Sequence, residues 1–442
     1  MESEDGFRRV LVANRGEIAR RLIRHYAERD IETAVVFSEA DAEQSYLDEC
    51  DYPVYLNGRT VAETYLHPQR VVSAALDAGC DAAHPGYCFL AEHLGFYEAA
   101  RGANLPIIGA AAATLPLTVD RPSLFDVARP LGIPLIPHSA AIPPIDDGIA
   151  AAVQVGVPLF VKAVHGKVMV RADTLDDLPA ALQEARIRAH VETGHVQVYL
   201  ERAVDTARQI GVVIAADKHG TCVPLGITDG SMELHYCTWV EELGQVVDEE
   251  LSTRITAASV RLAQAVGWVG IGKIRWAVTH EGGWYLLGFS ARLTTGFNLV
   301  EAVHGIDLLD AQFTALSGNA LGWDWTEPDR HGVQARIFHL DPATGTRPVG
   351  TLKRLTLPDD IGVDVGLDVG AEANRDTEPL VAKLTVSAPT RQAAIVRMKD
   401  ALSRTEIEGI ETNLAVLQQL FGHPDVWTDG GSVRTLRGLV SG

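Results

Sequence analysis

Cysteine is scarce in this chain, with five residues among 442, at positions 50, 80, 88, 222 and 237. They are scattered, odd in number and without Cys-x-x-Cys spacing. This pattern argues against both a disulfide framework and a zinc knuckle. We therefore expect reduced, mostly buried thiols.

Basic residues are outnumbered, with 38 Lys and Arg against 58 Asp and Glu, which gives a formal net charge of -20. Such a balance opposes binding to nucleic acid or to an anionic membrane. No apolar run approaches membrane-spanning length. The acidic start over residues 1–5 also lacks the basic and apolar regions of a secretory signal. The sequence predicts a cytoplasmic protein.

With 47% hydrophobic and 22% charged residues, the composition is that of a globular protein. A chain of this length is expected to form two or three packed α/β units. Near the N-terminus, periodicity predicts a βαβ unit, in which strands at 9–13 and 33–37 flank a helix.

Further along the chain, the pattern predicts a helix at 68–78 and short strands at 81–83 and 105–109. A helical connector and a proline-punctuated segment follow. The later strands are expected near 210–215, 234–241, 271–278 and 285–293.

Two N-terminal segments carry a family resemblance. Residues 10–19 (VLVANRGEIA) and 84–92 (HPGYCFLAE) closely resemble those that open the biotin carboxylase family of ATP-grasp enzymes. The rest of the chain follows that family's layout. The resemblance implies a three-part α/β fold: a doubly wound, Rossmann-like N-terminal domain, an ATP-grasp lid, and an ATP-grasp core with a C-terminal domain. We place these parts at 1–110, 133–204 and 205–442, with a helical connector at 111–132.

The lid resembles the family's only in part. Lys162 keeps the family's lysine at the end of a strand, but the loop that follows, AVHGKVM, has one glycine where the family has a run of them. Glycines are needed there because the backbone must approach the ATP phosphates closely. The other phosphate-binding lysine of the family appears here as Arg121. Glu201 matches the family's adenine-side glutamate.

At the family's magnesium positions this chain has Arg275 and Gly288, neither of which can ligate a cation. Strand alternation places residues 273 and 275 on one face, and 288, 290, 292 and 294 on one face of the neighbouring strand. We therefore expect a cationic site without a metal, with the candidate ligand-binding residues Lys273, Ser290 and Thr294.

The carboxylation motif keeps its arginine, Arg292, but the family's glutamate base on bicarbonate corresponds to Gly296. Thr238 stands where the family has a bicarbonate-binding lysine, and a further catalytic arginine is aligned with Asp364. Tyr236 and Phe297 replace polar family residues and are expected to make the cleft drier and more apolar.

The loop at 84–92 contains His84 and Tyr87. It is expected at the carboxyl edge of the N-terminal sheet, where α/β folds bind ligands. These two residues are candidates for orienting a ligand. Pro85 and Gly86 favour equally a purely conformational role for the loop.

Three functions are carried forward. The first is a repurposed enzyme of specialised metabolism that acts on a small carboxylate or acyl substrate without ATP, magnesium or biotin. Its candidate catalytic residues are Arg292, Lys162 and Arg275. The second is a non-catalytic partner of a carboxylase subunit. The third is a functional biotin carboxylase. The substitutions favour the first and disfavour the third. A homodimer is expected from the resemblance alone.

Overall fold

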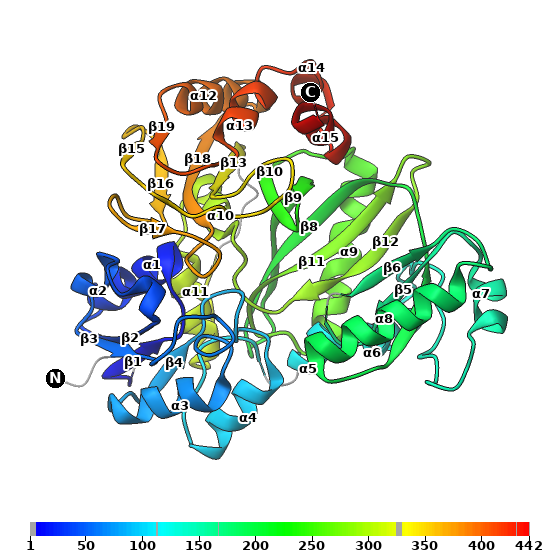
Figure 1. Cartoon of the computed structure of the whole chain (residues 1–442), viewed down its shortest axis with the longest axis horizontal. Coiled ribbons are helices and arrows are strands. Elements are labelled where there is room, and N and C mark those ends of the chain that lie inside the picture. The colour runs from blue at the N-terminus through cyan, green and yellow to red at the C-terminus, as the bar shows by residue number, and fades with distance from the viewer. Residues whose placement is uncertain (1–5, 112–113, 167, 324–328, 430, 442) are drawn as a thin grey trace.

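The computed structural model describes residues 6–111, 114–166, 168–323, 329–429 and 431–441. It shows a four-stranded sheet near the N-terminus, a three-stranded sheet and a central sheet of eight strands (Figure 1). Among the described residues, no helix has both the length and the apolar content needed to cross a membrane. Residues 1–5, which entered the prediction of location, lie outside the described residues.

The four-stranded sheet is parallel, in the order β3-β2-β1-β4. Its strands are β1 (Arg9–Val12), β2 (Glu32–Phe37), β3 (Tyr52–Tyr55) and β4 (Ala82–His84). Val10 and Val12 pack with α1 (Gly16–Ala27), while Leu11 between them packs with α3 (Pro68–Asp77) and α4 (Leu94–Gly102). Because successive side chains point to opposite faces, helices cover both sides of this sheet, which confirms the doubly wound fold. A 3-10 turn (Glu39–Asp41) and α2 (Tyr46–Glu49) connect β2 to β3.

The strand expected at 105–109 does not form. Only one bridge joins Ile107 to Ala83 of β4, held by the Ala83 N–H donating to Pro106 O and the Ile108 N–H donating to Ala83 O. Pro106 has no N–H to extend the ladder, so the pairing stops after one residue.

Two short helices, α5 (Leu115–Val119) and α6 (Arg121–Ala128), and a 3-10 turn (Arg129–Leu131) lead to the three-stranded sheet, ordered β6-β5-β7. Its elements are β5 (Leu159–Ala163), β6 (Met169–Ala172) and β7 (Val198–Arg202), with helices α7 (Ile149–Val155) and α8 (Leu178–Thr193). This sheet lies beside the eight-stranded sheet on the right of Figure 1. The boundaries at 110, 132 and 204 stay our proposal for the division of the chain.

The large sheet is ordered β12-β11-β8-β9-β10-β13-β18-β16, and its neighbours pair antiparallel. Its strands are β8 (Thr206–Ala216), β9 (Cys222–Leu234), β10 (Cys237–Leu243), β11 (Gly270–Thr279), β12 (Trp284–Ser290), β13 (His331–Phe338), β16 (Gly362–Val365) and β18 (Leu380–Ala388). Ile210, Val212 and Ile214 pack with α9 (Glu249–Ala265), whereas Val213 and Ala215 share a core with α10 (Phe297–His304) and α11 (Leu308–Leu316). The face of the large sheet that carries Val213 and Ala215 therefore lies toward the N-terminal sheet.

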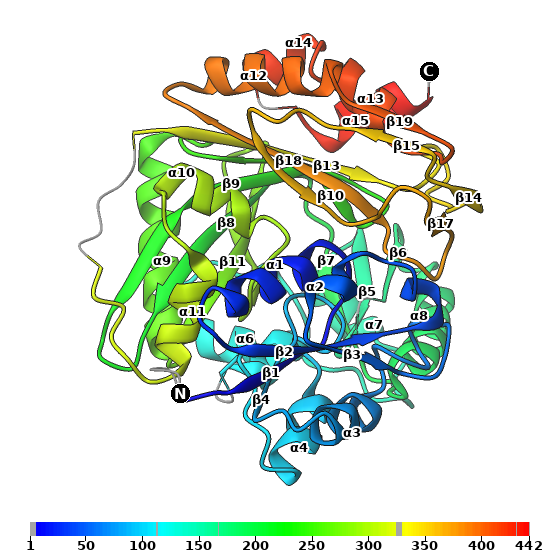
Figure 2. The same ribbon diagram turned by 90° about the vertical axis from the view of Figure 1, so that its left-hand side faces the viewer.

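The C-terminal helices lie along one edge of the molecule, above β13 and β18 in Figure 2. They are α12 (Arg391–Ser403), α13 (Leu414–Leu420), α14 (Pro424–Asp429) and α15 (Val433–Ser441). Two small antiparallel pairs complete this region, β14 (Gly350–Thr351) with β17 (Glu372–Ala373) and β15 (Arg354–Thr356) with β19 (Glu406–Glu408).

A strand was expected to run continuously over 234–241, but the chain reverses there. β9 ends at Leu234 and β10 begins at Cys237, and the two residues between them, His235 and Tyr236, have φ of 52° and 61°. Two consecutive residues of positive φ make the tight hairpin turn that matches the twist of its strands. Hydrophobic pattern alone gave no sign of this turn, because neither residue is the glycine or asparagine usual there.

A buried ion pair joins helix α1 to the large sheet. Glu17 of α1 lies 2.9 Å from Nζ of Lys383 on β18, and both side chains are almost fully buried. Burial raises the pKa of Glu17 to about 7, and Lys383 opposes this shift only in part.

This pKa predicts a stability that depends on pH. Between the ordinary glutamate pKa of 4.5 and about 7, the folded state keeps a proton that the unfolded state has lost. The melting temperature should therefore fall, through this group, as pH rises across that window. Glu17→Gln should flatten the dependence, whereas the exposed control Glu28→Gln should not. An unchanged slope in Glu17→Gln would contradict the assignment.

Candidate functional site

The lid contributes a buried ion pair. Lys162 of β5 and Glu201 of β7 lie on neighbouring antiparallel strands, and Nζ of Lys162 contacts Oε1 of Glu201. The Tyr199 hydroxyl donates to Oε2 of Glu201 at 3.3 Å. Burial lowers the pKa of Lys162, and Glu201 opposes that shift. The structure thus brings two predicted residues together, and each largely neutralises the other. In the loop beyond Lys162, Lys167 lies outside the described residues.

The positions aligned with the family's magnesium ligands are paired across β11 and β12, Arg275 with Gly288. A Cβ built on Gly288 would lie 3.8 Å from a terminal nitrogen of Arg275 and 3.9 Å from Nε of Arg121, the first residue of α6. The two guanidinium groups therefore meet over this glycine. Burial, and then the neighbouring Arg121, lower the pKa of Arg275 to about 10, although water still reaches its side chain. Arg275 is thus charged and exposed.

A second charge cluster occupies the same face of the large sheet. Lys273 extends from β11 across Gly211 of β8 to Oε1 of Glu241 on β10, while Arg336 of β13 contacts Oε2 of Glu241 from the other side. All three charged side chains are buried. Burial opposes ionisation of Glu241, but Lys273 and Arg336 outweigh it and lower its pKa to about 2. Glu241 is therefore an anion held between two cations.

Gly296, aligned with the family's glutamate base, borders this cluster. A Cβ there would overlap Oε2 of Glu241 and lie 2.9 Å from a terminal nitrogen of Arg336. The arginine beside this position is therefore Arg336. Asp364, which the alignment placed opposite the family's further catalytic arginine, lies on β16 with its carboxylate 4.0 Å from Nζ of Lys383.

Arg292 joins the loop at 84–92 to the large sheet. Its Nε donates to Oε2 of Glu92 at 2.9 Å, and Glu92 Oε1 accepts from the backbone N–H of Ala291 at 3.2 Å. Burial acts to lower the pKa of Arg292, but Glu92 outweighs it and the pKa is raised. The candidate catalytic residues Lys162 and Arg292 are thus each paired with a carboxylate, so they do not form a cluster of three unneutralised cations with Arg275. The contact of these residues with a ligand stays a prediction.

Hydrogen bonds from its own residues and from Asn14 hold the conformation of the loop at 84–92. Nδ1 of His84 accepts the Gly86 N–H at 2.9 Å, and burial lowers the pKa of His84 to about 3. The Asn14 side chain donates to the carbonyls of Pro85 at 2.8 Å and Tyr87 at 2.7 Å. The Tyr87 side chain is buried in the core. Both predicted loop residues therefore fix a conformation, and neither is shown to bind a ligand.

Two predicted lining residues lie elsewhere. Tyr236 is 82% exposed at the tip of the β9–β10 hairpin, and Phe297 is 2% exposed, packed in the core with its ring 4.8 Å from Nζ of Lys383. Neither makes the cleft more apolar, so that expectation is wrong. Sequence reasoning could not separate an aromatic side chain in a core from one in a cleft.

Among the smaller candidate residues, Thr238 and Thr294 make hydrogen bonds through their backbone carbonyls. The Thr238 carbonyl accepts from Arg336 at 3.4 Å, and the Thr294 carbonyl accepts the Phe297 N–H at 3.0 Å. Ser290 ends β12 opposite Lys273. Their direct contact with a ligand stays a prediction.

Four residues that order the site were not proposed from the sequence: Asn14, Glu92, Glu241 and Arg336. Asn14 and Glu92 lie inside the two N-terminal segments that carry the family resemblance, which is a signal that could have found them. Glu241 and Arg336 lie in ordinary-looking strands 95 residues apart, and only the strand order brings them together.

Magnesium, which the family implies, does not fit these side chains. Its usual ligands are oxygen atoms, and the aligned positions offer a guanidinium and a glycine. In the part of the chain that the structure describes, no three His, Cys, Asp or Glu residues are grouped so as to hold a metal ion. The described side chains at these positions therefore do not provide a magnesium site.

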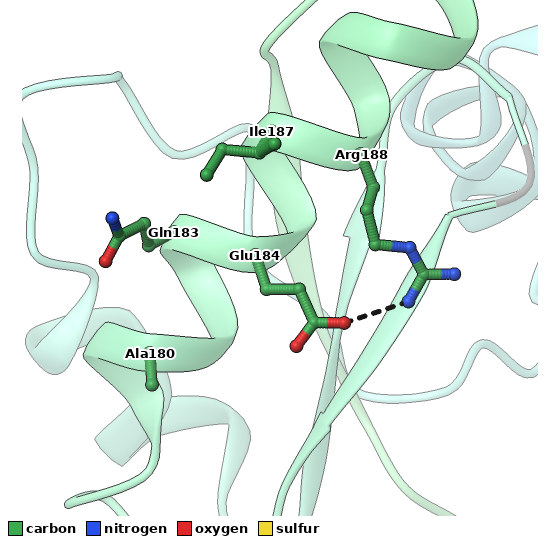
Figure 3. A pocket seen from close by; sticks show the side chains of 5 residues that line it. All are labelled: Ala180, Gln183, Glu184, Ile187 and Arg188. Atoms are coloured by element: carbon green, nitrogen blue, oxygen red, sulfur yellow. Dashed lines mark hydrogen bonds and ion pairs between the residues drawn. The ribbon is translucent and has the colours of Figure 1, made fainter.

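Figure 3 shows a hollow that is separate from this site. It is lined by Ala180, Gln183, Glu184, Ile187 and Arg188, all on α8, where Arg188 pairs with Glu184 at 3.0 Å. The hollow holds none of the charged residues described above.

Comparison with known families covers almost the whole chain. Residues 6–115 match the biotin carboxylase N-terminal domain, residues 120–323 the ATP binding domain of the carbamoyl-phosphate synthase L chain, and residues 334–437 the biotin carboxylase C-terminal domain.

Individual relatives agree. A biotin carboxylase of Halalkalibacterium halodurans is 34% identical over 95% of this chain and 94% of its own. Biotin carboxylase 2 of Bacillus subtilis is 31% identical over 96% of this chain and 98% of its own. The crystal structure of a biotin carboxylase–nucleotide complex from Campylobacter jejuni superimposes with a TM-score of 0.91 at 27% identity, covering 98% of this chain and 99% of that one.

These matches overturn the function first expected from the substitutions. An enzyme that had left ATP, bicarbonate and biotin for another small acid or acyl substrate is contradicted by the ATP-binding domain at 120–323 and by full-length relatives that are biotin carboxylases. The error lay in reading each altered position alone, although neighbouring strands supply other charged groups to the same face. The chain belongs to the biotin carboxylase family.

Proposed function

We propose that this protein is a biotin carboxylase that uses ATP and bicarbonate to carboxylate biotin. The observation that carries the proposal is the extent of the match. A biotin carboxylase N-terminal domain, an ATP binding domain and a biotin carboxylase C-terminal domain follow one another between residues 6 and 437. Fold alone would not be sufficient, because one fold can host several activities. Relatives at 31% and 34% identity over almost the entire chain add to it.

The charged groups of the site support roles in this reaction. Arg292, fixed by Glu92, is placed to bind an anion such as bicarbonate through charge-assisted hydrogen bonds. Glu241 orients the neighbouring cations Lys273 and Arg336. The Lys162 and Glu201 pair lies on the lid strands, where a nucleotide would be enclosed. In this proposal the protein binds and orients two anionic substrates, and preorganised cations lower the cost of bringing their charges together.

We also propose that the chain works as the carboxylase component of a larger assembly and forms a homodimer. One relative is the alpha subunit of a mitochondrial methylcrotonoyl-CoA carboxylase of Dictyostelium discoideum, 27% identical over 94% of this chain and 61% of its own. A 2-oxoglutarate carboxylase domain of Hydrogenobacter thermophilus, with a TM-score of 0.91, was crystallised as a dimer with MgADP and bicarbonate. A cytoplasmic location is part of the proposal, and it agrees with the absence of a disulfide among the described cysteines.

The test is a carboxylation assay on the purified protein. We expect release of phosphate from ATP that requires bicarbonate and rises with free biotin, together with incorporation of labelled bicarbonate into biotin. The assay is run with and without Mg²⁺, and a related biotin carboxylase serves as positive control. No labelled product under any of these conditions, while the control is active, would refute the proposed function.

A further inference from the structure

Arg121 and Arg275 form a pair of adjacent cations over Gly288, here called the cationic site. Their guanidinium nitrogens lie 3.9 Å and 3.8 Å from the place that a Cβ on this glycine would take. Gly288 has a φ of +143°, a conformation that other residues rarely adopt. This backbone conformation favours glycine, so residue 288 places no side chain between the two guanidinium groups.

The two arginines form no direct ion pair. Within the described ranges, no carboxylate is paired within 4.0 Å of Arg121 or Arg275: Glu201 pairs with Lys162, and Glu92 with Arg292. Glu92 and Glu233 act on Arg275 as nearby charges that raise its pKa, but burial and Arg121 outweigh them. Arg121 and Arg275 repel each other, and Arg121 is one cause of the lowered pKa of Arg275. Two like charges held together in this way are relieved by an anionic ligand.

The location of the two arginines and the geometry of their guanidinium groups indicate a phosphate ligand. Arg121 is hydrogen-bonded to Tyr199 of the lid and lies close enough to Lys162 to lower its pKa, so the cationic site lies where the lid strands and the large sheet meet. The guanidinium group presents a planar fork of donors that matches phosphate oxygens. All of these residues fall inside the ATP-binding domain match at 120–323.

We infer that Arg121 and Arg275 bind the polyphosphate of a nucleotide directly, with protein cations supplying positive charge at the positions aligned with the family's metal ligands. The identity of the nucleotide rests on the proposed function, whereas the anion site itself rests on the two arginines. Direct binding implies that affinity for the nucleotide does not depend on a divalent metal.

The experiment is calorimetry with ATP and with pyrophosphate, each in EDTA and in Mg²⁺. We expect the unaltered protein to bind ATP in EDTA, and Arg275→Met to weaken this binding about 10- to 150-fold, the loss expected for a charge-assisted hydrogen bond. Arg121→Met should act in the same direction. The control is Arg261→Met, which removes the same charge from an exposed position on α9, on the opposite face of the sheet.

Melting temperature separates a ligand site from a structural role. Without ligand, Arg275→Met should leave the melting temperature unchanged or raise it, because a repulsion is removed, and it should abolish the rise that ATP causes in EDTA. Binding that strictly requires Mg²⁺, or Arg275→Met that binds ATP as the unaltered protein does, would overturn the inference. Malonate that binds as tightly as pyrophosphate would overturn the assignment to phosphate. Metal-free ATP binding without carboxylation would refute the proposed function and leave this site intact.

Discussion

Glu241→Ala is expected to lower the free energy of unfolding by about 3 to 5 kcal/mol, the usual cost of removing one partner from a buried ion pair. Lys273 and Arg336 would be left buried and facing each other without an anion. Denaturant unfolding measures the effect. Glu250→Ala, on the exposed surface of α9, is the matched control and should change stability by no more than about 0.5 kcal/mol. A loss of that small size in Glu241→Ala would show that the cluster is not a stabilising element.

A second substitution tests whether Glu241 is what requires glycine at position 296. Gly296→Ala should destabilise the unaltered protein, because its Cβ would overlap Oε2 of Glu241 and crowd Arg336. In the Glu241→Ala background the overlap is gone, so the same change should cost less. The difference is the coupling energy of a double-mutant cycle. Strictly additive losses would contradict this explanation.

Arg292→Ala is expected to reduce kcat/KM for carboxylation about 10- to 150-fold, the range given by the loss of one charge-assisted hydrogen bond to substrate. Arg292 is oriented by the Glu92 carboxylate at 2.9 Å, and one of its terminal nitrogens donates to the Leu293 carbonyl at 2.7 Å. Steady-state kinetics at varied bicarbonate would separate its roles. A rise in KM alone indicates a group that binds substrate and transition state equally, whereas a fall in kcat indicates a contact made in the transition state.

Glu92→Gln extends the test to the residue that positions Arg292. It should weaken activity less than Arg292→Ala, because the arginine remains but its orientation is less fixed. Arg261→Ala is the control for loss of a surface charge. Full activity in Arg292→Ala, measured beside an active unaltered enzyme, would remove Arg292 from the site.

Much of the N-terminal region could be predicted from the sequence, because its signals are local. The alternation of Val10, Leu11 and Val12 and the helical spacing of Ile18 and Leu22 place these side chains without knowledge of the rest of the fold. Two predicted strands, at 105–109 and across 234–241, were wrong for reasons that are also local but that the hydrophobic pattern does not show. Pro106 cannot donate to a ladder, and the hairpin turn at Tyr236 depends on backbone conformation.

The reaction was harder to predict because it depends on which charges meet. Gly296 was taken as a lost base and Arg275 as a lost metal site, and both positions were judged by alignment alone. The structure brings Glu241 against Gly296 and Arg121 beside Arg275. The matched families then contradicted the expected change of function.

The sequence by itself determined the family, the doubly wound N-terminal sheet and the face that Lys273 and Arg275 share, since motif identity and strand alternation are properties of neighbouring residues. The tertiary structure decided which of the cations are neutralised. Lys273 reaches Glu241 past β8 and β9, which separate β11 from β10, because it extends across Gly211, where no side chain blocks it. Arg292 meets Glu92 because the N-terminal loop packs at the end of β12. Charge pairing acts through space over a few ångströms, so it is set by strand order and domain packing, which no local pattern records.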